Sequence, residues 1–330
     1  MKIFVTGATG FVGQHLVKRL LEQGNNVVAL CRDSSKLQPL LSENLKIIKG
    51  DLSNSEALLK GMEGATQVYH LAAFAKVWDK NPNVYQDINV KGSIAVADAA
   101  VKEGVEKLVF TSTAGVFGDS ENGLVTESIE RKRPFFNEYE STKKEAEDRL
   151  LEFASDKLKL VIVNPTRIYG PLLNSPAEAV NLLIQKFTTG QWRLIPGDGS
   201  KIGNYVYIDD VINGHLLAME KGEHGHNYIL GGENHDYNSF FNTLKEISGT
   251  NPWMMKMPNN LQMAFAKLQM LKPLVNKEPL ITPGWIAKGY YHWEVSSQKA
   301  ERQLGYQITP LREGIKKTVE VLLGNKPSTV

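Results

Sequence analysis

The chain has 330 residues, and its 38 lysines and arginines nearly balance 36 aspartates and glutamates, for a formal charge of +2 at pH 7. This length allows one large domain or two smaller ones, and the charge balance gives no electrostatic reason to expect nucleic acid or an anionic membrane as a partner. The single cysteine, Cys31, excludes an internal disulfide. The opening "MKIFVTGATG" lacks the features of a signal peptide, and no apolar run reaches the roughly 18 residues that span a bilayer. We therefore expect a cytoplasmic globular protein.

Short apolar segments alternate with helical patterns through the first half of the chain. Continuous apolar strands separated by amphipathic helices, such as the pattern over 87–104, predict a parallel sheet that is covered on both faces. Right-handed crossovers then give an α/β fold with a Rossmann-type, doubly wound parallel sheet. The expected strands are 2–5, 26–31, 45–50, 66–72, 106–112 and 158–165.

A glycine-rich turn follows the first expected strand. The segment "TGATGFVG" places Gly7, Gly10 and Gly13 between that strand and the first helical pattern. Glycine permits tight backbone dihedrals and a close approach to a pyrophosphate, and the helix N-terminus offers free N–H groups to the phosphates. In this strand–turn–helix setting the turn predicts a dinucleotide site.

The end of the second strand bears on which dinucleotide is bound. An acidic residue there would hold the 2′-hydroxyl of NAD, whereas a nearby arginine accommodates the 2′-phosphate of NADP. Here Cys31 is neutral, Arg32 follows it, and Lys36 offers a second positive charge, while Asp33 begins a turn. We therefore favour NADP(H) over NAD(H), although Arg32 as a solvated loop charge is the alternative.

Two further strand ends carry candidate contacts with the cofactor. In "GDL", Asp51 is expected to accept a hydrogen bond from the adenine amino group while Leu52 packs on the ring. In "HLAA", the small Ala72 and Ala73 would let the backbone pass close to the cofactor, and His70 is expected to be a packed strand residue rather than a catalyst.

The second half of the chain has a different texture. After Tyr169 the alternation of strands and helices stops, then a strand and helix return near 205–220, and the tail is aromatic and rich in methionine. We predict a dinucleotide-binding domain over 1–168 plus about 205–232. A smaller, discontinuous C-terminal substrate domain is predicted over about 169–204 plus 233–330.

The charged helical pattern "FFNEYESTKKEAEDRL" holds Tyr139 four residues before Lys143. Only this one of the 11 tyrosines has a lysine four places later, but composition alone predicts about one such match, so its position between the fifth and sixth strands matters more. An ammonium on the same helical face stabilises phenolate and lowers the pKa of a tyrosine from its usual value near ~10. The other charges are expected to form solvated i,i+4 pairs, Glu140 with Lys144 and Glu145 with Arg149.

With the glycine turn, the segments "GDL", "HLAA", "NVKGS", "FTSTAGVFG", "YESTK", "NPTRIYGP" and "YVYIDDV" occur in the order typical of one family. The chain resembles the extended short-chain dehydrogenases/reductases, clearly over 1–232 and more loosely to its end. Within that superfamily of NAD-dependent epimerases and dehydratases it looks most like the dihydroflavonol-4-reductase-like branch. The resemblance implies a hydride-transfer enzyme.

The resemblance also implies site residues. Tyr139 would be the general acid/base with Lys143 as its partner, Thr113 the hydroxyl beside the substrate oxygen, and Asn89 an active-site asparagine. The expected cofactor contacts are Gly7, Thr9, Gly10, Phe11, Val12, Gly13, Arg32, Lys36, Asp51, Leu52, Leu71, Ala72, Ala73, Tyr139, Lys143, Pro165, Thr166 and Ile168.

Apolar side chains near the expected site are candidates for the substrate wall. Phe74 and Trp78 follow the fourth strand, Phe136 shortly precedes Tyr139, and "GYYHW" (289–293) is a candidate from the second domain. Each of these groups is about as compatible with packing in a core between the two domains as with contact to a substrate. The basic segment "ERKRP" (130–134) is expected to be a solvated loop, and "HGH" (224–226) a polar turn rather than a metal site, so no metal is predicted.

Departures from related enzymes narrow the reaction. Thr113 is followed by Ala114 and Gly115 instead of the acidic pair that dehydratases of the superfamily carry. Nucleotide-sugar epimerases commonly hold the diphosphate with an arginine just before the "YVYIDDV"-like strand, where this chain has Gly203, although Arg193 or Lys201 could substitute.

We therefore predict an NADP-dependent carbonyl reductase or alcohol dehydrogenase that acts on a small-molecule ketone, aldehyde or secondary alcohol, as a monomer or homodimer. An NAD-dependent nucleotide-sugar 4-epimerase is the alternative enzyme. A regulatory protein that senses the redox state of the nicotinamide is a third interpretation, and a complete set of catalytic residues counts against it.

Overall fold

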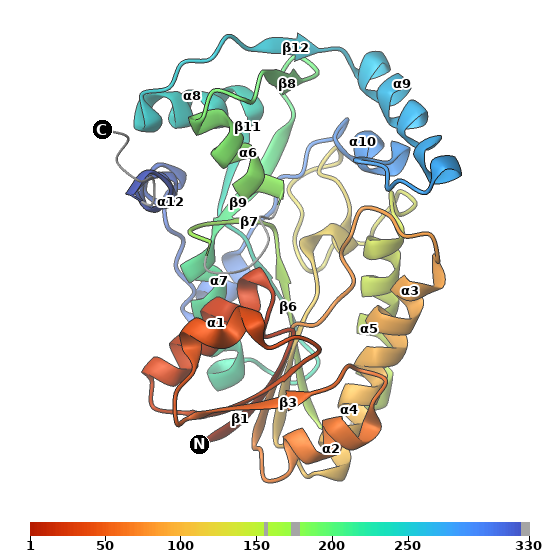
Figure 1. The fold of residues 1–330 in the computed structure, drawn as a ribbon, viewed down its shortest axis with the longest axis vertical. Helices are drawn as coiled ribbons and strands as arrows, with labels where there is room; N and C mark the ends of the chain where they lie inside the picture. Colours follow the sequence, from red (N-terminus) through yellow and green to blue (C-terminus); the bar gives the residue numbers. More distant parts are fainter. Residues whose placement is uncertain (155–157, 173–178, 325–330) are drawn as a thin grey trace.

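The computed structural model describes residues 1–154, 158–172 and 179–324. Its centre is a parallel seven-stranded sheet in the order β10-β6-β5-β4-β1-β2-β3, flanked by helices (Figure 1). The predicted Rossmann-type fold is thereby confirmed. The strands are β1 (Lys2–Thr6), β2 (Asn26–Cys31), β3 (Leu45–Lys49), β4 (Gln67–His70), β5 (Lys107–Thr111), β6 (Lys159–Pro165) and β10 (Asn227–Leu230).

The two faces of the sheet pack against separate sets of helices. Side chains of adjacent strand residues point to opposite faces, so Ile3 and Val5 lie in one apolar core while Phe4 lies in the other. Helices α1 (Phe11–Glu22) and α7 (Ile208–Lys221) contact each other over the first core. Over the second core, α4 contacts both α2 and α5, which completes the doubly wound arrangement. The bounds of these three helices are α2 (Ser55–Met62), α4 (Gly92–Lys102) and α5 (Glu138–Ala154).

The helix expected over 87–104 is interrupted near its start. A short turn α3 (Asn83–Tyr85) leads into a π-helical turn, η2 (Gln86–Lys91), before regular α4 begins. A π-helical turn inserts an extra residue per turn and is frequently found at functional sites. Here the wide turn carries Asn89, whose side chain is buried.

A second layer stands at the carboxyl edge of the main sheet, in the upper part of Figure 1. Its three-stranded sheet has the order β11-β9-β7, so the strand expected near 205 belongs to this layer, while α7 and β10 return to the main sheet. The range 169–204 of the predicted substrate domain includes 173–178, which lie outside the described residues. The strands of this layer are β7 (Arg167–Tyr169), β9 (Ile202–Tyr207), β11 (Glu233–Asp236) and the pair β8 (Leu194–Pro196) and β12 (Met255–Met257).

The remaining helices lie in this second layer and in the segments that connect it with the main sheet. Segment 292–296 ties the layer to the loop that follows β5, because Ser120 N–H donates to the His292 carbonyl at 2.8 Å and Val125 forms a parallel bridge with Val295. The helices are α6 (Ala179–Thr188), α8 (Tyr237–Ser248), α9 (Asn259–Gln269), η4 (Lys272–Val275), α10 (Pro283–Lys288), α11 (Gln298–Leu304) and α12 (Leu311–Gly324), with 3₁₀ turns η1 (Ser35–Leu40) and η3 (Ala114–Phe117).

The two-core packing makes a prediction for stability. Leu160 of β6 is fully buried in the second core, so Leu160→Ala is expected to lower the free energy of unfolding by about 2–5 kcal/mol through lost burial and a residual cavity. Leu124, which is 51% exposed, is the matched control, and Leu124→Ala should change stability by less than about 0.5 kcal/mol. Urea unfolding measures both, and equal losses would contradict the assigned packing.

Candidate active site

The glycine turn between β1 and α1 is built for close approach. Gly7 has a φ of +73°, and a Cβ there would lie 2.5 Å from the backbone nitrogen of Ala72. A Cβ at Gly13 would lie 2.1 Å from the carbonyl oxygen of Gly7. Helix α1 begins at Gly10 without a side-chain cap, so its first N–H groups remain available to an anion.

The segment after β4 presses against this turn, while the predicted passage of Ala72 and Ala73 close to a cofactor stays a prediction. Leu71 N–H donates to the Thr6 carbonyl at 3.2 Å, and Ala72 N–H donates to the Thr6 hydroxyl at 3.3 Å. His70 is buried between the hydroxyls of Thr6 (2.6 Å) and Ser93 (2.9 Å). Burial and the nearby charge of Lys143 lower the His70 pKa to about 3. His70 is thus a neutral, packed strand residue, as expected.

Asp33 begins a turn after β2, as the sequence predicted, and contact of Arg32 or Lys36 with a cofactor stays a prediction. Asp33 accepts hydrogen bonds from the N–H and the hydroxyl of Ser35, both at 2.9 Å, and so forms the turn that begins η1. Arg32 is exposed, and Lys36 is half-buried in the same turn. No acidic side chain stands at the last residue of β2, which is the buried Cys31.

The "GDL" residues after β3 are already engaged within the protein. The Asp51 carboxylate accepts from the Ser53 hydroxyl at 2.6 Å and from its N–H at 2.9 Å, and these hydrogen bonds lower the Asp51 pKa. Leu52 packs against Gly92 at the start of α4, where a Cβ would lie 2.7 Å from it. Contact of either residue with adenine stays a prediction.

Lys143 lies on the inner face of α5 and is almost fully buried. Its ammonium nitrogen sits 3.9 Å from the ring centroid of Phe110 on β5, and it makes no hydrogen bond to any described residue. Burial lowers the Lys143 pKa to about 7, although the charge of Glu147, one turn further along, raises it. Glu147 is buried too, and it accepts a 2.6 Å hydrogen bond from the Asn164 side chain of β6.

Tyr139 and Thr113 lie at the same end of α5 as Lys143. Tyr139 is the second residue of the helix and is half-buried. Thr113 follows β5 and caps η3, its hydroxyl accepting from the Gly115 N–H at 3.2 Å, while its carbonyl accepts from Asn164 at 3.2 Å. A shared helical face brings Lys143 beside Tyr139.

Asn89 is fully buried on the π-helical turn, and its amide is used within the protein. Its nitrogen donates to the Phe74 carbonyl (3.1 Å) and the Thr142 hydroxyl (3.0 Å), and its oxygen accepts from the Phe74 N–H at 2.7 Å. Asn89 therefore clamps the segment after β4 onto α5. The catalytic role implied by the resemblance stays a prediction, and these contacts favour a positioning role.

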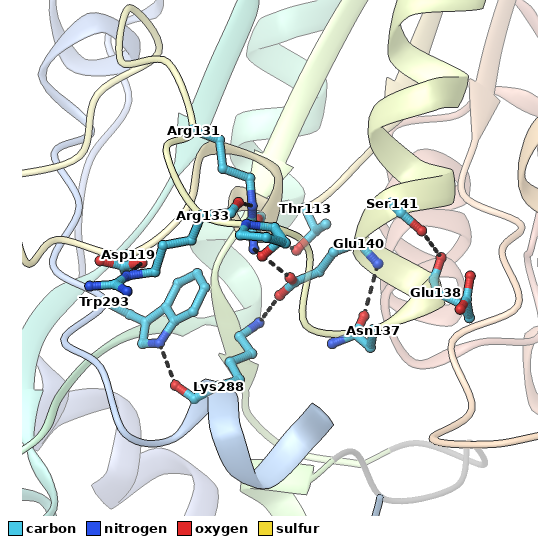
Figure 2. Close-up of polar contacts among 12 residues, drawn as sticks. Thr113, Asp119, Arg131, Arg133, Asn137, Glu138, Glu140, Ser141, Lys288 and Trp293 are labelled. Carbon is cyan, nitrogen blue, oxygen red and sulfur yellow. Dashed lines mark hydrogen bonds and ion pairs between the residues drawn. The ribbon is translucent and has the colours of Figure 1, made fainter. Parts of the chain in front are cut away.

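The expected solvated pair of Glu140 with Lys144 is wrong. Glu140 is fully buried, and Figure 2 shows its carboxylate between Arg131, at 3.3 Å, and Lys288 of α10, at 2.6 Å. Lys144 pairs with Asp148 instead, whereas the expected Glu145–Arg149 pair is present at 3.9 Å. Glu140 stands three residues before Lys143, so the helical period carried a signal for this inward position.

The expectation that "ERKRP" is a solvated loop is also wrong for Arg131. Its guanidinium is nearly buried, donates to the carbonyls of Gly115 and Pro134, and pairs with Glu140 (Figure 2). Arg133 is more exposed and pairs with Asp119 at 3.0 Å. Arg131 thus fastens the loop of Thr113 to the start of the Tyr139 helix, and no sequence motif distinguished it from its neighbours.

Arg167 occupies the space that Gly203 leaves open. A Cβ at residue 203 would lie 2.3 Å from Nη1 of Arg167, and this nitrogen donates to the hydroxyls of Tyr205 (3.3 Å) and Tyr237 (3.4 Å). Within the described residues Arg167 forms no ion pair, and its charge contributes to lowering the Lys288 pKa. Of the basic residues considered as substitutes, Arg193 is exposed and Lys201 pairs with Glu121 at 3.4 Å.

The remaining predicted contacts lie along β6, β7 and the loops around them. Pro165 ends β6, the Thr166 hydroxyl donates to the Asn204 side chain at 2.7 Å, and Ile168 is half-buried on β7. Phe74 packs edge-on against Tyr85, whereas Phe136 packs against Tyr291 and Trp293 of the second layer. Trp78 is half-buried. Substrate contact by Phe74, Trp78 or Phe136 stays a prediction.

Three observations fit a bound dinucleotide. The buried ammonium of Lys143 has no hydrogen-bond partner among the described residues, the cradle at Gly7 and Gly13 has no room for side chains, and α1 begins without a side-chain cap. A ribose hydroxyl would give Lys143 the acceptor that it lacks, and a pyrophosphate would meet the free N–H groups.

Comparisons with known proteins agree with this arrangement. Residues 3–231 match the model of the NAD dependent epimerase/dehydratase family. A putative dihydroflavonol 4-reductase of Synechocystis sp. is 30% identical over 94% of this chain and 92% of its own length. A 2-alkyl-3-oxoalkanoate reductase of Stenotrophomonas maltophilia is 34% identical over 67% of this chain and 66% of its own. A UDP-glucose 4-epimerase of Thermotoga maritima, solved with UDP-glucose, superposes with a TM-score of 0.82 at 28% identity, covering 98% of this chain and 99% of that one.

The matched family model covers more than half of the chain, and it spans the glycine turn after β1 and helix α5 with Lys143. The chain therefore belongs to the NAD dependent epimerase/dehydratase family and is an NAD(P)-dependent enzyme of the extended short-chain dehydrogenase/reductase type.

Proposed function

We propose that this protein is an NADP-dependent carbonyl reductase or alcohol dehydrogenase, similar to dihydroflavonol-4-reductase. It would transfer hydride between the nicotinamide and a ketone, aldehyde or secondary alcohol. The observation that carries the proposal is the unpartnered ammonium of Lys143, buried one helical turn from Tyr139 on the face of α5 that packs on β5.

Each of the proposed catalytic residues has a role that follows from its place. When bound, the nicotinamide supplies hydride to the carbonyl carbon. Tyr139 gives its phenolic proton to the carbonyl oxygen, and the neighbouring ammonium of Lys143 stabilises the phenolate that remains. The Thr113 hydroxyl donates a hydrogen bond to the same oxygen as negative charge develops. Asn89 holds the segment of Phe74 against α5, which supports the site without touching the reacting atoms.

The choice of NADP rests on the end of β2. Arg32 directly follows β2 and is exposed, and an arginine near this strand end can accommodate the 2′-phosphate of NADP. NAD enzymes have an acidic residue at the end of this strand for the 2′-hydroxyl, and this chain has the neutral Cys31 there. Asp33 does not compensate, because its carboxylate is engaged with Ser35.

Arg167 supports a substrate that carries an anionic group. Arg131 and Lys288 pair with the one carboxylate of Glu140, and the charge of Arg167 acts on Lys288, so positive charge is in excess around this cluster. A guanidinium matches the two oxygens of a carboxylate or phosphate. The similar 2-alkyl-3-oxoalkanoate reductase has a carboxylate in the substrate that names it, and we propose a ketone or alcohol acid for this chain.

Arg167 also gives the alternative, a nucleotide-sugar 4-epimerase, a specific observation in its favour. Its guanidinium fills the space next to Gly203, the position at which such epimerases commonly carry the arginine for the diphosphate. The superposed UDP-glucose 4-epimerase supports the same alternative at the level of the fold. An epimerase would interconvert sugar nucleotides without net consumption of cofactor, which separates the two functions.

The proposed reaction predicts a strict requirement for Tyr139. Purified enzyme should oxidise NADPH faster than NADH with at least one ketone or aldehyde of a broad panel, and Tyr139→Phe should lower the turnover by about 10²–10⁴-fold because the proton donor is lost. Tyr228, whose hydroxyl accepts from the Glu223 N–H at 3.2 Å and which has no place in the proposed site, provides the control Tyr228→Phe. The assignment would be refuted if the wild type reduced none of the carbonyl compounds or if Tyr139→Phe kept full activity. A wild type that binds NADPH but reduces none of them would favour a redox sensor.

The lowered pKa of Lys143 predicts a pH dependence of stability in the cofactor-free protein. The folded state loses this proton near pH 7, whereas the unfolded chain keeps it to about 10.4. Between these values the unfolded state binds more protons, so the free energy of unfolding should rise with pH, by up to about 1.4 kcal/mol per unit. Urea unfolding at pH 7, 8 and 9 should show a shallower rise for Lys143→Met than for wild type. Lys144→Met is the control, and parallel curves for wild type and Lys143→Met would contradict the assignment.

The role of Arg167 can be measured by titration calorimetry on the NADP-loaded protein. Decanoate should bind more tightly than methyl decanoate, and Arg167→Met should weaken decanoate binding about 10-fold or more by removing a charge-assisted contact while sparing the ester. Arg193→Met makes the same change in charge at an exposed site and should bind like wild type. Binding of UDP-glucose that depends on Arg167 would favour the epimerase. If the Arg167 and Arg193 variants bind all probes alike, Arg167 does not recognise an anion.

A further inference from the structure

Helix α9 packs on the protein with two glutamines and an alanine and turns its large apolar side chains outward. Gln262, Ala266 and Gln269 face the protein, and the two glutamines contact main chain, with Gln262 donating to the Met257 carbonyl and Gln269 accepting from the Leu280 N–H. Leu261, Phe265 and Leu268, which follow one another at helical spacing, are exposed. This is the reverse of an ordinary surface helix, in which the apolar stripe faces the core.

The outward side chains continue into the 3₁₀ turn η4 and form one apolar face. The exposed fraction of the side chain is 62% for Leu268, 81% for Leu274 and 66% for Val275. Nine of the seventeen large hydrophobic side chains that are exposed in the described part of the chain fall within residues 253–280. A monomeric protein in water rarely exposes so large a contiguous apolar surface without a partner. The apolar face consists of Leu261, Phe265, Leu268, Leu271, Leu274 and Val275.

Positive charge accompanies the apolar face. Residues 251–277 contain four lysines, Lys256, Lys267, Lys272 and Lys277, and no aspartate or glutamate. None of the four forms an ion pair with a described residue. The first acidic residue after them, Glu278, is paired with Lys76 at 3.4 Å. The near-neutral charge of the whole chain therefore conceals a local excess of four positive charges.

We propose that the apolar face of α9 and η4 docks on the surface of an anionic phospholipid bilayer. An interfacial helix buries its apolar side chains at the boundary between headgroups and acyl chains, while flanking lysines meet anionic headgroups. No helix in the described ranges is long and apolar enough to cross a bilayer, so the contact is peripheral. The near-zero net charge gave no reason to expect an anionic membrane as a partner. The proposal revises that expectation, because binding to a membrane depends on the charge of the surface that contacts it and not on the net charge of the chain.

A second copy of the chain fits this face less well than lipid. A two-fold contact places the same patch on both partners, so the four unpaired lysines of one copy would face the same four lysines of the other.

The apolar face also lies beside the proposed site. Figure 1 shows α9 on the outer rim next to α10, and α10 ends at Lys288, which pairs with Glu140 next to Tyr139. Docking would thus hold α10, and with it the proposed site, near the lipid surface, where an amphipathic acid or alcohol would be concentrated.

Vesicle co-sedimentation of the full chain tests the proposal without reference to its reaction. Wild type should bind vesicles with about 30% phosphatidylglycerol in phosphatidylcholine much more than vesicles of phosphatidylcholine alone, and salt raised to ~500 mM should weaken the binding by screening. The triple variant Leu268→Gln, Leu271→Gln, Leu274→Gln should lower the partition coefficient at least ~10-fold. Lys267→Gln with Lys272→Gln should remove most of the preference for the anionic lipid.

The controls separate docking from unfolding and from general stickiness. Leu41→Gln with Leu124→Gln changes two side chains that are 52% and 51% exposed away from this face, and it should bind vesicles like wild type. Thermal unfolding should be unchanged in the triple variant, because its three side chains pack little in the folded protein. The proposal is overturned if wild type does not bind the anionic vesicles or if the triple variant binds them equally. Size exclusion that shows a dimer lost in the triple variant, with no vesicle binding, would assign the face to a second copy.

Discussion

The ammonium of Lys143 is the group on which the arrangement of the site depends. A charge that is buried beside the Phe110 ring without a hydrogen bond has lost its hydration, and Glu147 one turn away compensates only in part. The fold maintains this costly position because α5 is packed over its length against β5, β6 and α4. A bound dinucleotide would supply the missing acceptor, so the same desolvation that destabilises the empty protein favours binding of the cofactor.

The ion pairs of Glu140, the residue after Tyr139, hold the start of α5 in place. Arg131 arrives from the loop before α5, and Lys288 arrives from the end of α10, almost 150 residues later in the chain (Figure 2). Truncating one member of such a buried cluster leaves uncompensated charge, so its members are mutually dependent. Through Lys288 the second layer is coupled to the first turn of α5, and through Arg167 the same region keeps a positive charge that no described carboxylate neutralises.

Charge and hydrophobicity have to be judged locally in this protein. The net charge of +2 is a sum in which the unpaired lysines around α9 are offset by acids elsewhere on the surface. In the same way, the hydrophobic period of α9 predicts an amphipathic helix but says nothing about which face the protein covers. The glutamines of α9 face inward because they find main-chain partners there, and the leucines are left at the surface.

By itself the sequence determined the parallel sheet, the glycine turn and the spacing of Tyr139 and Lys143 along one helix, because each follows from a pattern within a strand, a turn or one helical turn. His70 as a packed residue could be anticipated for the same reason. Only the tertiary structure decided that Glu140 and Arg131 are buried, that Lys288 reaches them, and that Arg167 fills the space at Gly203. These contacts join segments far apart in the chain. Whether a charge lies in water or in the interior depends on what the rest of the fold places over it, and no local pattern records that.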